Sequence, residues 1–197
     1  MRLLVVHAHP VPESFGTALF RAVVETAEGA GHEVRALDLH AEGFDPVMGP
    51  EERRGYNDGG PPDDPVLLRH IEHLRWAEGI VLVYPTWWYS QPAMLKGWLD
   101  RVWRMGAAFH LGPRGLVPGL PQVRLLGVVT TLGSPRWLWS AVMGAPGRKV
   151  ILRGLRACTG WRTRTFWLAL HDIDTATPER RARFLARVRA RIARLPA

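Results

Sequence analysis

The segment Gly79–Arg104, which starts with GIVLVYPTWWYSQPAMLKGWLDR, decides the fold. Its first part, Ile80–Tyr84, is apolar at every position, which is typical of a strand buried on both faces of a parallel sheet. Pro85 breaks this run. Pro92 suits the first turn of a helix, because the N–H that proline lacks has no partner there. We therefore predict a strand, an exposed aromatic loop and then a helix that ends near Met105.

The loop between the predicted strand and helix contains three consecutive aromatic residues, Trp87, Trp88 and Tyr89. Open α/β sheets bind their ligands outside the carboxyl ends of the strands, and this loop follows such a strand. Three adjacent aromatic rings in that position favour a flat ligand. Ordinary packing in a core or interface explains the loop equally well when it is considered alone.

Four more segments have the apolar patterns of strands: Arg2–Val6, Glu33–Leu37, Val123–Val129 and Arg164–Leu170. Helices are expected after Ser14, from Pro65 to Trp76, in parts of 137–160 with a break around 144–147, and from Thr177 onward. Five strands with interleaved helices predict a doubly wound parallel α/β sheet. Candidate ligand loops after the first, third and fourth strands favour the strand order 2-1-3-4-5.

The length of 197 residues suits one well-buried domain and is short for two, so we expect a single domain over residues 1–197. Residues 38–64 interrupt the pattern, because they are rich in Gly, Pro, Asp and Glu. Loops of this length inside compact domains are usually functional or partly disordered. We therefore predict a long loop insertion at about 38–64.

The formal net charge of +8 does not indicate nucleic-acid binding. Much of it lies in Arg180–Arg194, where Phe184 and Val188 recur at helical spacing, so the arginines form the solvated face of an amphipathic helix. No run approaches the ~20 apolar residues of a membrane span. A single cysteine, Cys158, fits a reducing compartment and a buried structural thiol. We expect a cytoplasmic protein.

The first candidate ligand loop leads into the helix that begins near Ser14. Free N–H groups and the helix dipole make such a place a binding site for anions. Ser14, Phe15, Gly16 and Thr17 open the helix, and a hydroxyl of Ser14 or Thr17 and the imidazole of His9 could bind a phosphate. Capping by Ser14 and packing by His9 explain the same residues without a ligand. No phosphate-loop or G-x-G-x-x-G motif is present, so a nucleotide triphosphatase or Rossmann dehydrogenase is not indicated.

The third candidate loop consists of Thr130, Thr131, Leu132 and Gly133. Small residues at a strand end let the backbone approach a flat ring and donate N–H groups to it. With the other two loops, this one lines a single edge of the predicted sheet. One loop holds a phosphate and two hold a ring, so flavin is the natural candidate. No metal-ligand spacing or nucleophile motif is found, which fits a cofactor that performs the chemistry.

Three motifs recur together in a known family: His7-Ala8-His9-Pro10 with Ser14-Phe15, the long stretch Tyr84–Val102, and Thr130–Ser134. In their order and spacing the sequence resembles the NAD(P)H:quinone oxidoreductase family of flavodoxin-like, diaphorase-type flavoproteins. The resemblance covers the chain to about residue 135, together with the final helix. It implies a flavodoxin-like sheet and a homodimer with two flavin sites at the subunit interface.

The resemblance also implies roles for individual residues. It places His9, Ser14, Phe15 and Gly16 near the flavin phosphates, Pro85, Thr86, Trp87, Trp88 and Tyr89 against the isoalloxazine, and Thr130, Thr131, Leu132 and Gly133 at its other border. Gly16 stands where the family usually has Asn, so one side-chain hydrogen bond is missing. The resemblance assigns Lys96, Gly97, Asp100 and Arg101 a structural role, in the helix that fixes the loop and the dimer contact.

The sequence departs from the family beyond Ser134. Longer members carry a Tyr and a His there, whereas this chain has Trp137 or Trp139 in place of the Tyr and Met143 in place of the His. These three are candidate substrate-pocket residues, and no catalytic residue is assigned. This chain is shorter than those members, so the adenine end of an FAD would have fewer contacts. The bound flavin can therefore be FAD or FMN, and the match of the loop motifs to the family favours FAD.

These features predict an NAD(P)H-dependent flavoprotein oxidoreductase that reduces quinones or similar flat acceptors. The alternative is a flavin-binding regulatory subunit of a potassium efflux system or another peripheral partner, which would dock on residues 38–64 or on the arginine-rich helix. A flavodoxin-type electron carrier ranks last, since such carriers usually have acidic docking surfaces. Arg136, Arg148 and Arg153 each qualify to contact the 2′-phosphate of NADPH, and the sequence does not select among them.

Overall fold

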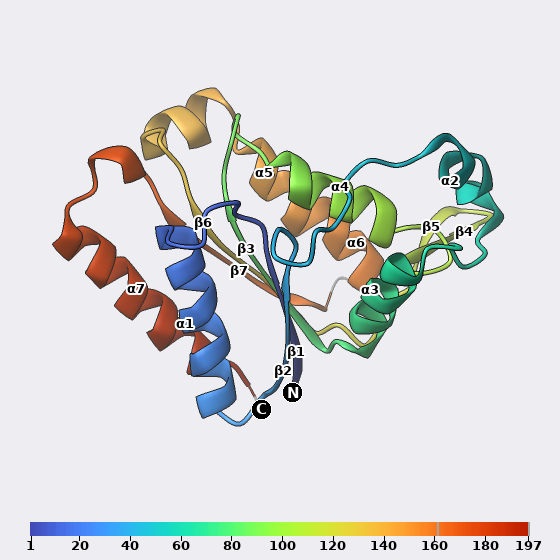
Figure 1. Ribbon diagram of the computed structural model, residues 1–197, viewed down its shortest axis with the longest axis horizontal. Coiled ribbons are helices and arrows are strands. Elements are labelled where there is room, and N and C mark those ends of the chain that lie inside the picture. Colours follow the sequence, from blue (N-terminus) through green and yellow to red (C-terminus); the bar gives the residue numbers. More distant parts are fainter. Residues whose placement is uncertain (161, 197) are drawn as a thin grey trace.

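A five-stranded parallel sheet forms the centre of the computed structural model, which describes residues 1–160 and 162–196 (Figure 1). The strands are β1 (Arg2–His7), β2 (Glu33–Asp38), β3 (Gly79–Pro85), β6 (Leu125–Thr131) and β7 (Arg164–Leu170). They lie in the order β2-β1-β3-β6-β7, and all neighbours are parallel. This is the predicted order 2-1-3-4-5, so the flavodoxin-like fold is confirmed.

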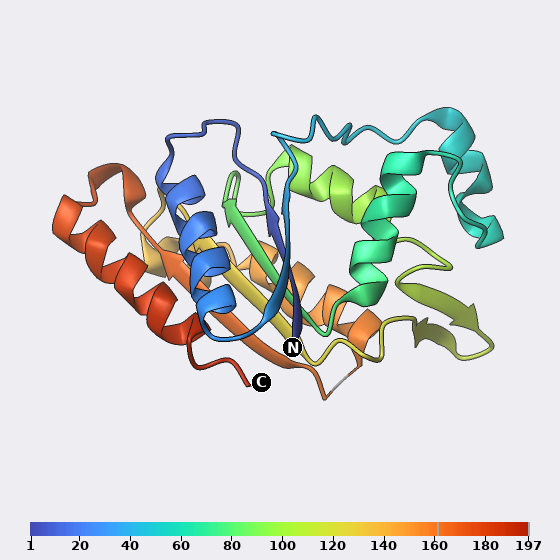
Figure 2. The same cartoon turned by 60° about the horizontal axis from the view of Figure 1, so that its bottom comes forward.

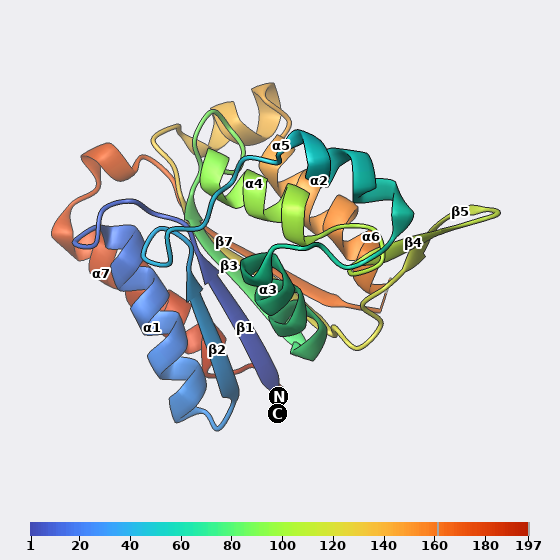
Figure 3. The same ribbon diagram turned by 45° about the vertical axis from the view of Figure 1, so that its right-hand side comes forward.

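Helices cover both faces of the sheet (Figures 1 and 3). Helices α1 (Phe15–Gly29) and α7 (Pro178–Ile192) lie side by side on one face, and α3 (Pro65–Trp76) and α4 (Ala93–Val102) lie on the other. Between β6 and β7 the chain forms four short helical pieces: Leu138–Val142, α5 (Pro146–Lys149), Val150–Leu155 and α6 (Arg156–Thr159). Positive φ angles at Gly144 and Ala145 make the break that the sequence suggested there.

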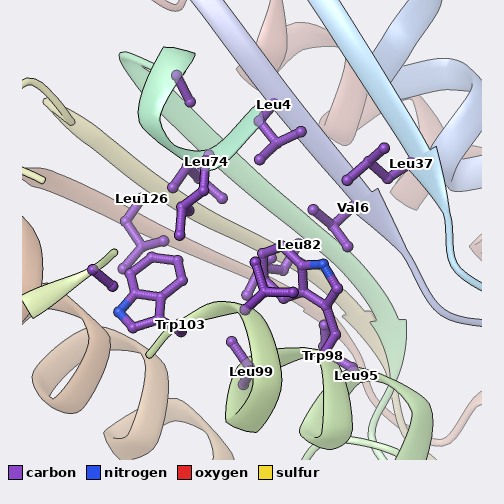
Figure 4. Close-up of a cluster of buried hydrophobic side chains, with 14 of the residues drawn as sticks. Leu4, Val6, Leu37, Leu74, Leu82, Leu95, Trp98, Leu99, Trp103 and Leu126 are labelled. Carbon is purple, nitrogen blue, oxygen red and sulfur yellow. The ribbon is translucent and has the colours of Figure 1, made fainter. Parts of the chain in front are cut away.

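Strands buried on both faces explain the continuous apolar runs in the sequence. On one face Trp98, which is fully buried, packs among leucines of the sheet and of α3 and α4 (Figure 4). Its indole N–H donates to Nδ1 of the buried His70 at 3.0 Å. On the other face Phe184 and Val188 of α7 pack with α1 and the sheet. Among the residues described, none of the helices combines the length and apolar character that a membrane crossing requires.

A two-stranded antiparallel hairpin, β4 (Phe109–Gly112) and β5 (Gly115–Pro118), is absent from the sequence prediction. It extends away from the sheet, as Figure 2 shows. Its strands have four residues each and expose apolar side chains such as Leu111, so they lack the alternation by which half-buried strands are recognised. The Gly-Pro-Arg-Gly turn at 112–115 is the signal that was available.

The insertion at 38–64 contains a short helix, α2 (Pro50–Gly55), and is held to α4 by Arg101. This guanidinium is 7% exposed, and it donates to the Glu52 carboxylate at 2.8 Å and to the Asp64 carboxylate at 3.3 Å. A Cβ at Gly97 would lie 2.2 Å from the Pro46 carbonyl oxygen, so only glycine lets the insertion pass this close to α4. Arg101 and Gly97 therefore position the insertion at 38–64, whose location the sequence pattern did not predict.

We expect Gly97→Ala to lower the free energy of unfolding by about 1–3 kcal/mol, because the new methyl group overlaps the backbone of Pro46. The matched control is Gly154→Ala, since nothing lies within 4 Å of a Cβ at that helical glycine. The control should be neutral or stabilise by about 0.4–1 kcal/mol. Urea unfolding monitored by circular dichroism measures both, and equal midpoints for the two variants would contradict the packing argument.

Candidate functional site

The carboxyl ends of β1, β3 and β6 meet at one edge of the sheet. Parallel pairing continues past the strands, because the N–H of Ala8 donates to the Val83 carbonyl at 3.2 Å and that of Thr86 donates to the Thr131 carbonyl at 2.7 Å. The three loops that the sequence singled out therefore leave the sheet side by side. Their relative position is set by the backbone ladder rather than by the loops themselves.

The first loop ends at a capped helix start. The Ser14 hydroxyl accepts the N–H of Thr17 at 3.1 Å, which is the geometry of an N-cap. The N–H groups of Phe15 and Gly16 belong to the first turn, where a helix offers no acceptor. Ser14 thus shapes the helix start, and the donors left for an anion are the backbone groups of Phe15 and Gly16.

The Thr17 hydroxyl points inward, unlike the ligand-facing role that the sequence suggested. Thr17 is 5% exposed, and its oxygen lies 3.2 Å from Nε2 of the fully buried His7. His7 Nδ1 donates to the Val83 carbonyl at 3.1 Å. Burial lowers the pKa of His7, which favours the neutral ring, and the Thr17 hydroxyl also donates to the Val11 carbonyl at 3.1 Å. Thr17 therefore contacts His7 in the protein interior, and His7 in turn links α1 to β3.

His9 lies over the start of α1. Its Nδ1 accepts the N–H of Val11 at 3.1 Å, and burial lowers its pKa, so in the neutral ring Nε2 carries the proton and is a donor. A Cβ at Gly16 would lie 3.2 Å from His9 Cδ2. The His9 ring therefore occupies the space beside Gly16, where the family usually has an Asn side chain. The ring also lies 6.3 Å from the ring of Trp87, between centroids, which links the first loop to the second.

The aromatic loop is a tight hairpin with a strained backbone. Trp87 and Ser90 exchange two backbone hydrogen bonds, of 3.2 and 3.0 Å. The residues between them, Trp88 and Tyr89, have φ angles of 46° and 64°. Two consecutive positive φ angles are usual for Asn-Gly turns and are costly for bulky side chains. Trp88 is nevertheless 93% exposed, so no packing within the chain offsets its strain. Strain of this kind concentrates at ligand sites.

The third loop begins later than the sequence analysis placed it, because Thr130 and Thr131 belong to β6. Thr130 is 1% exposed, and its hydroxyl lies 2.8 Å from that of Thr86. This contact joins the second and third loops under the site instead of facing a ligand. Leu132 is also buried, which leaves Gly133 as the exposed member of the segment.

A hollow of about 580 Å³ opens between the second and third loops. Its lining consists of Thr86, Trp87, Trp88, Tyr89, Leu132, Gly133 and Ser134. Pro85, the last residue of β3, is buried beneath it. The structure therefore brings the residues predicted to border a ring into one place, with the start of α1 next to them through the contact of His9 with Trp87.

The three candidate substrate-pocket residues do not line this hollow. Trp137 and Met143 are 65% and 42% exposed on the segment after β6. Trp139 is 4% exposed and stacks on Trp167, with ring centroids 5.5 Å apart. These three side chains therefore lie outside the hollow, although Gly147 of the same segment bonds to the Tyr89 carbonyl of the aromatic hairpin at 3.2 Å.

Gln91 ends the predicted aromatic loop, and the sequence analysis assigned it no role. It is 8% exposed, and its amide N–H₂ donates to the Gly147 carbonyl at 3.0 Å while its oxygen accepts from the Ser90 hydroxyl at 2.9 Å. The N–H of Gly147 donates in turn to the backbone carbonyl of Tyr89 at 3.2 Å. The hairpin is thus tied to a segment more than fifty residues later. A polar residue before Pro92 gave no sign of so distant a partner.

The comparison with protein families identifies the fold family. A family model described as a flavodoxin-like fold matches residues 1–193, so the chain belongs to this family. The strand order and the position of the three loops are those that this fold requires.

Curated relatives confirm the resemblance drawn from the motifs. An uncharacterized NAD(P)H oxidoreductase, YcaK, of Escherichia coli is 36% identical over 56% of this chain and 57% of its own length. The human ribosyldihydronicotinamide dehydrogenase [quinone] is 29% identical over 67% of this chain and 63% of its own length. The matches thus span little more than half of these relatives. The solved NAD(P)H:quinone oxidoreductase from Methanothermobacter marburgensis superposes with a TM-score of 0.83 at 24% identity, covering 98% of this chain and 96% of that one.

We expect Trp88→Asn to raise the free energy of unfolding of the ligand-free monomer by about 1 kcal/mol, because asparagine tolerates a positive φ and Trp88 packs on nothing within its own chain. Trp137→Asn is the matched control, since Trp137 is also exposed but has a helical φ of −64°. Thermal and urea unfolding compare the two. The strain argument fails if Trp88→Asn stabilises no more than Trp137→Asn.

Proposed function

We propose that this protein is an NAD(P)H-dependent flavoprotein oxidoreductase that reduces quinones or similar flat acceptors, with residues 1–197 forming one flavin-binding domain. The observation that carries the proposal is the convergence of an anion-binding helix start and a strained, exposed aromatic hairpin around one hollow. The names of the curated relatives support the same reaction class. They give no support to the alternative of a regulatory subunit.

The residues present fit a flavin. In this proposal the N–H groups of Phe15 and Gly16 and the Nε2–H of His9 hold its phosphate, and Trp87 and Trp88 contact its ring. The N–H of Leu132 already donates to the Leu170 carbonyl at 3.0 Å. In the described part of the chain the N–H of Gly133 has no such acceptor, so it is the donor available to the ring. For the flavin itself we propose FAD, on the loop match described above.

A bound flavin supplies the redox chemistry, since it accepts a hydride from NAD(P)H and passes electrons to the acceptor. The protein binds, orients and tunes it. The Gly133 N–H would stabilise negative charge on the ring, and the aromatic side chains would exclude water from one face. Among the described residues that line the hollow there is no carboxylate, imidazole or amine, and the Tyr89 phenol is the titratable group there. Such a flat, apolar wall discriminates poorly among flat acceptors.

The test compares two substitutions at the helix start. Gly16→Asp places a negative charge against the proposed phosphate, whereas Gly16→Asn changes the same volume without charge. We expect the Asp variant to bind flavin at least tenfold more weakly than the Asn variant, although an acidic residue in the first helical turn does not destabilise a helix. Flavin fluorescence quenching measures the affinity.

The same preparation tests the reaction. The wild-type protein should carry a flavin spectrum and oxidise NAD(P)H in the presence of a benzoquinone. Acid release of the flavin followed by chromatography distinguishes FAD from FMN. A colourless protein that binds no added flavin would refute the proposal, and equal flavin affinities for the two Gly16 variants would refute the assigned phosphate site.

We also propose that the protein is a cytoplasmic homodimer. Several large apolar side chains are exposed on the aromatic hairpin, on the segment after β6 and on the β4–β5 hairpin, namely Trp88, Trp137, Val142, Met143, Leu111 and Val117. Exposed apolar groups of this kind mark interaction surfaces, and a second subunit that covers them would close the open side of the hollow.

Sedimentation velocity should therefore give twice the mass of one chain. We expect Val142→Asp, which places a charge at a residue 63% exposed, to shift the protein toward monomer without lowering its thermal stability as a monomer. The control is Ala141→Asp, at the adjacent exposed position. A monomeric wild-type protein at micromolar concentration would contradict the proposed dimer.

A further inference from the structure

A second cleft, of about 420 Å³, lies at the free edge of the sheet, where β7 has no further strand beside it. It is bounded by β7, by α7 and by the helical segment that follows β6. None of the functions proposed above uses this cleft.

The cleft is strongly cationic. Arg136, Arg148 and Arg187 reach it from three separate parts of the chain, and no aspartate or glutamate is among its described lining residues. Within residues 1–160 and 162–196 none of these three guanidinium groups forms an ion pair, although most of the buried or half-buried arginines near the insertion do. Three unpaired arginines around one cavity favour a ligand with several anionic oxygens.

The floor of the cleft carries unused hydrogen-bond donors. Trp139 and Trp167 stack with their ring planes 22° apart, and both line the cavity. The indole N–H groups of both residues are buried, and neither has an acceptor in the described chain. A buried donor without an acceptor is destabilising, so a ligand oxygen that accepts from it is stabilising.

The cleft shares a wall with the proposed flavin site. Ser134 lines the hollow beside the aromatic hairpin, and His171 lines the cleft. The Nδ1–H of His171 donates to the Ser134 carbonyl at 3.3 Å, and Arg136 follows Ser134 by two residues. A ligand with one end over the aromatic hairpin therefore has an anion site beside its path.

We propose that this cleft binds the 2′-phosphate of NADPH and so selects NADPH over NADH. The inference rests on the proposed oxidoreductase function for the identity of the donor. A phosphomonoester has the oxygens and charge that three guanidinium groups and an indole N–H recognise, and arginine is the usual partner of this phosphate. Of the three arginines that qualified by sequence, the structure selects Arg136 and Arg148, adds Arg187 and leaves out Arg153, which does not line the cleft.

The first test needs no flavin. 2′,5′-ADP is titrated into the protein at low ionic strength and followed by isothermal titration calorimetry, with 5′-AMP and inorganic phosphate as separate arms. We expect 2′,5′-ADP to bind at least tenfold more tightly than 5′-AMP or phosphate. Arg148→Gln and Arg187→Gln should each weaken its binding at least tenfold, and the matched control Arg153→Gln, an exposed arginine on the same helical segment as Arg148, should not.

The second test uses the flavin-loaded protein. Arg148→Gln should raise the KM for NADPH at least tenfold while the KM for NADH stays unchanged, because NADH lacks the 2′-phosphate. The inference is overturned if 2′,5′-ADP does not bind, if 5′-AMP binds as tightly, or if Arg148→Gln and Arg153→Gln behave alike. A protein that binds 2′,5′-ADP in this pattern but holds no flavin would refute the oxidoreductase proposal alone.

Discussion

The parallel pairing of β3 with β1 on one side and β6 on the other is the constraint on which the rest of the structure depends. Because all three strands run in the same direction, their carboxyl ends share one edge, and whatever follows each strand is delivered there. The ladder extends beyond the strands through the N–H groups of Ala8 and Thr86. The loops consequently start from fixed backbone positions, which is what a preorganised binding site requires.

Beneath the exposed surface of the site lies a layer of small polar contacts. Thr86 meets Thr130, Thr17 meets His7, and Gln91 meets Gly147. These contacts join the aromatic loop to β6, α1 to β1 and the aromatic loop to α5, and each is nearly or fully buried. Buried polar groups of this kind are satisfied in only one arrangement, since an unpaired donor or acceptor is costly. The contacts of Thr86 and Gln91 flank the turn in which Trp88 and Tyr89 have positive φ angles.

Polar contacts of the same kind hold the insertion at 38–64. Arg101 bonds to Glu52 and Asp64 from a nearly buried position, while Gly97 lets Pro46 approach the helix. The helix that follows the aromatic hairpin is thus fixed on one side by the core around Trp98 and on the other by the insertion. Its N-terminal end carries the hairpin, so the insertion contributes to the rigidity of the site from a distance.

The sequence by itself determined the sheet, its strand order and the edge at which a ligand would bind. The physical reason is that burial on both faces leaves a continuous apolar run such as Ile80–Tyr84, and that Ser14 and Pro92 mark helix starts by local chemistry. Only the tertiary structure decided the direction of individual side chains. The hydroxyl groups of Thr17 and Thr130 face the protein interior, and Trp139 stacks on Trp167. Arg136, Arg148 and Arg187 line one cleft. These positions depend on partners far away in the chain, which no local sequence pattern specifies.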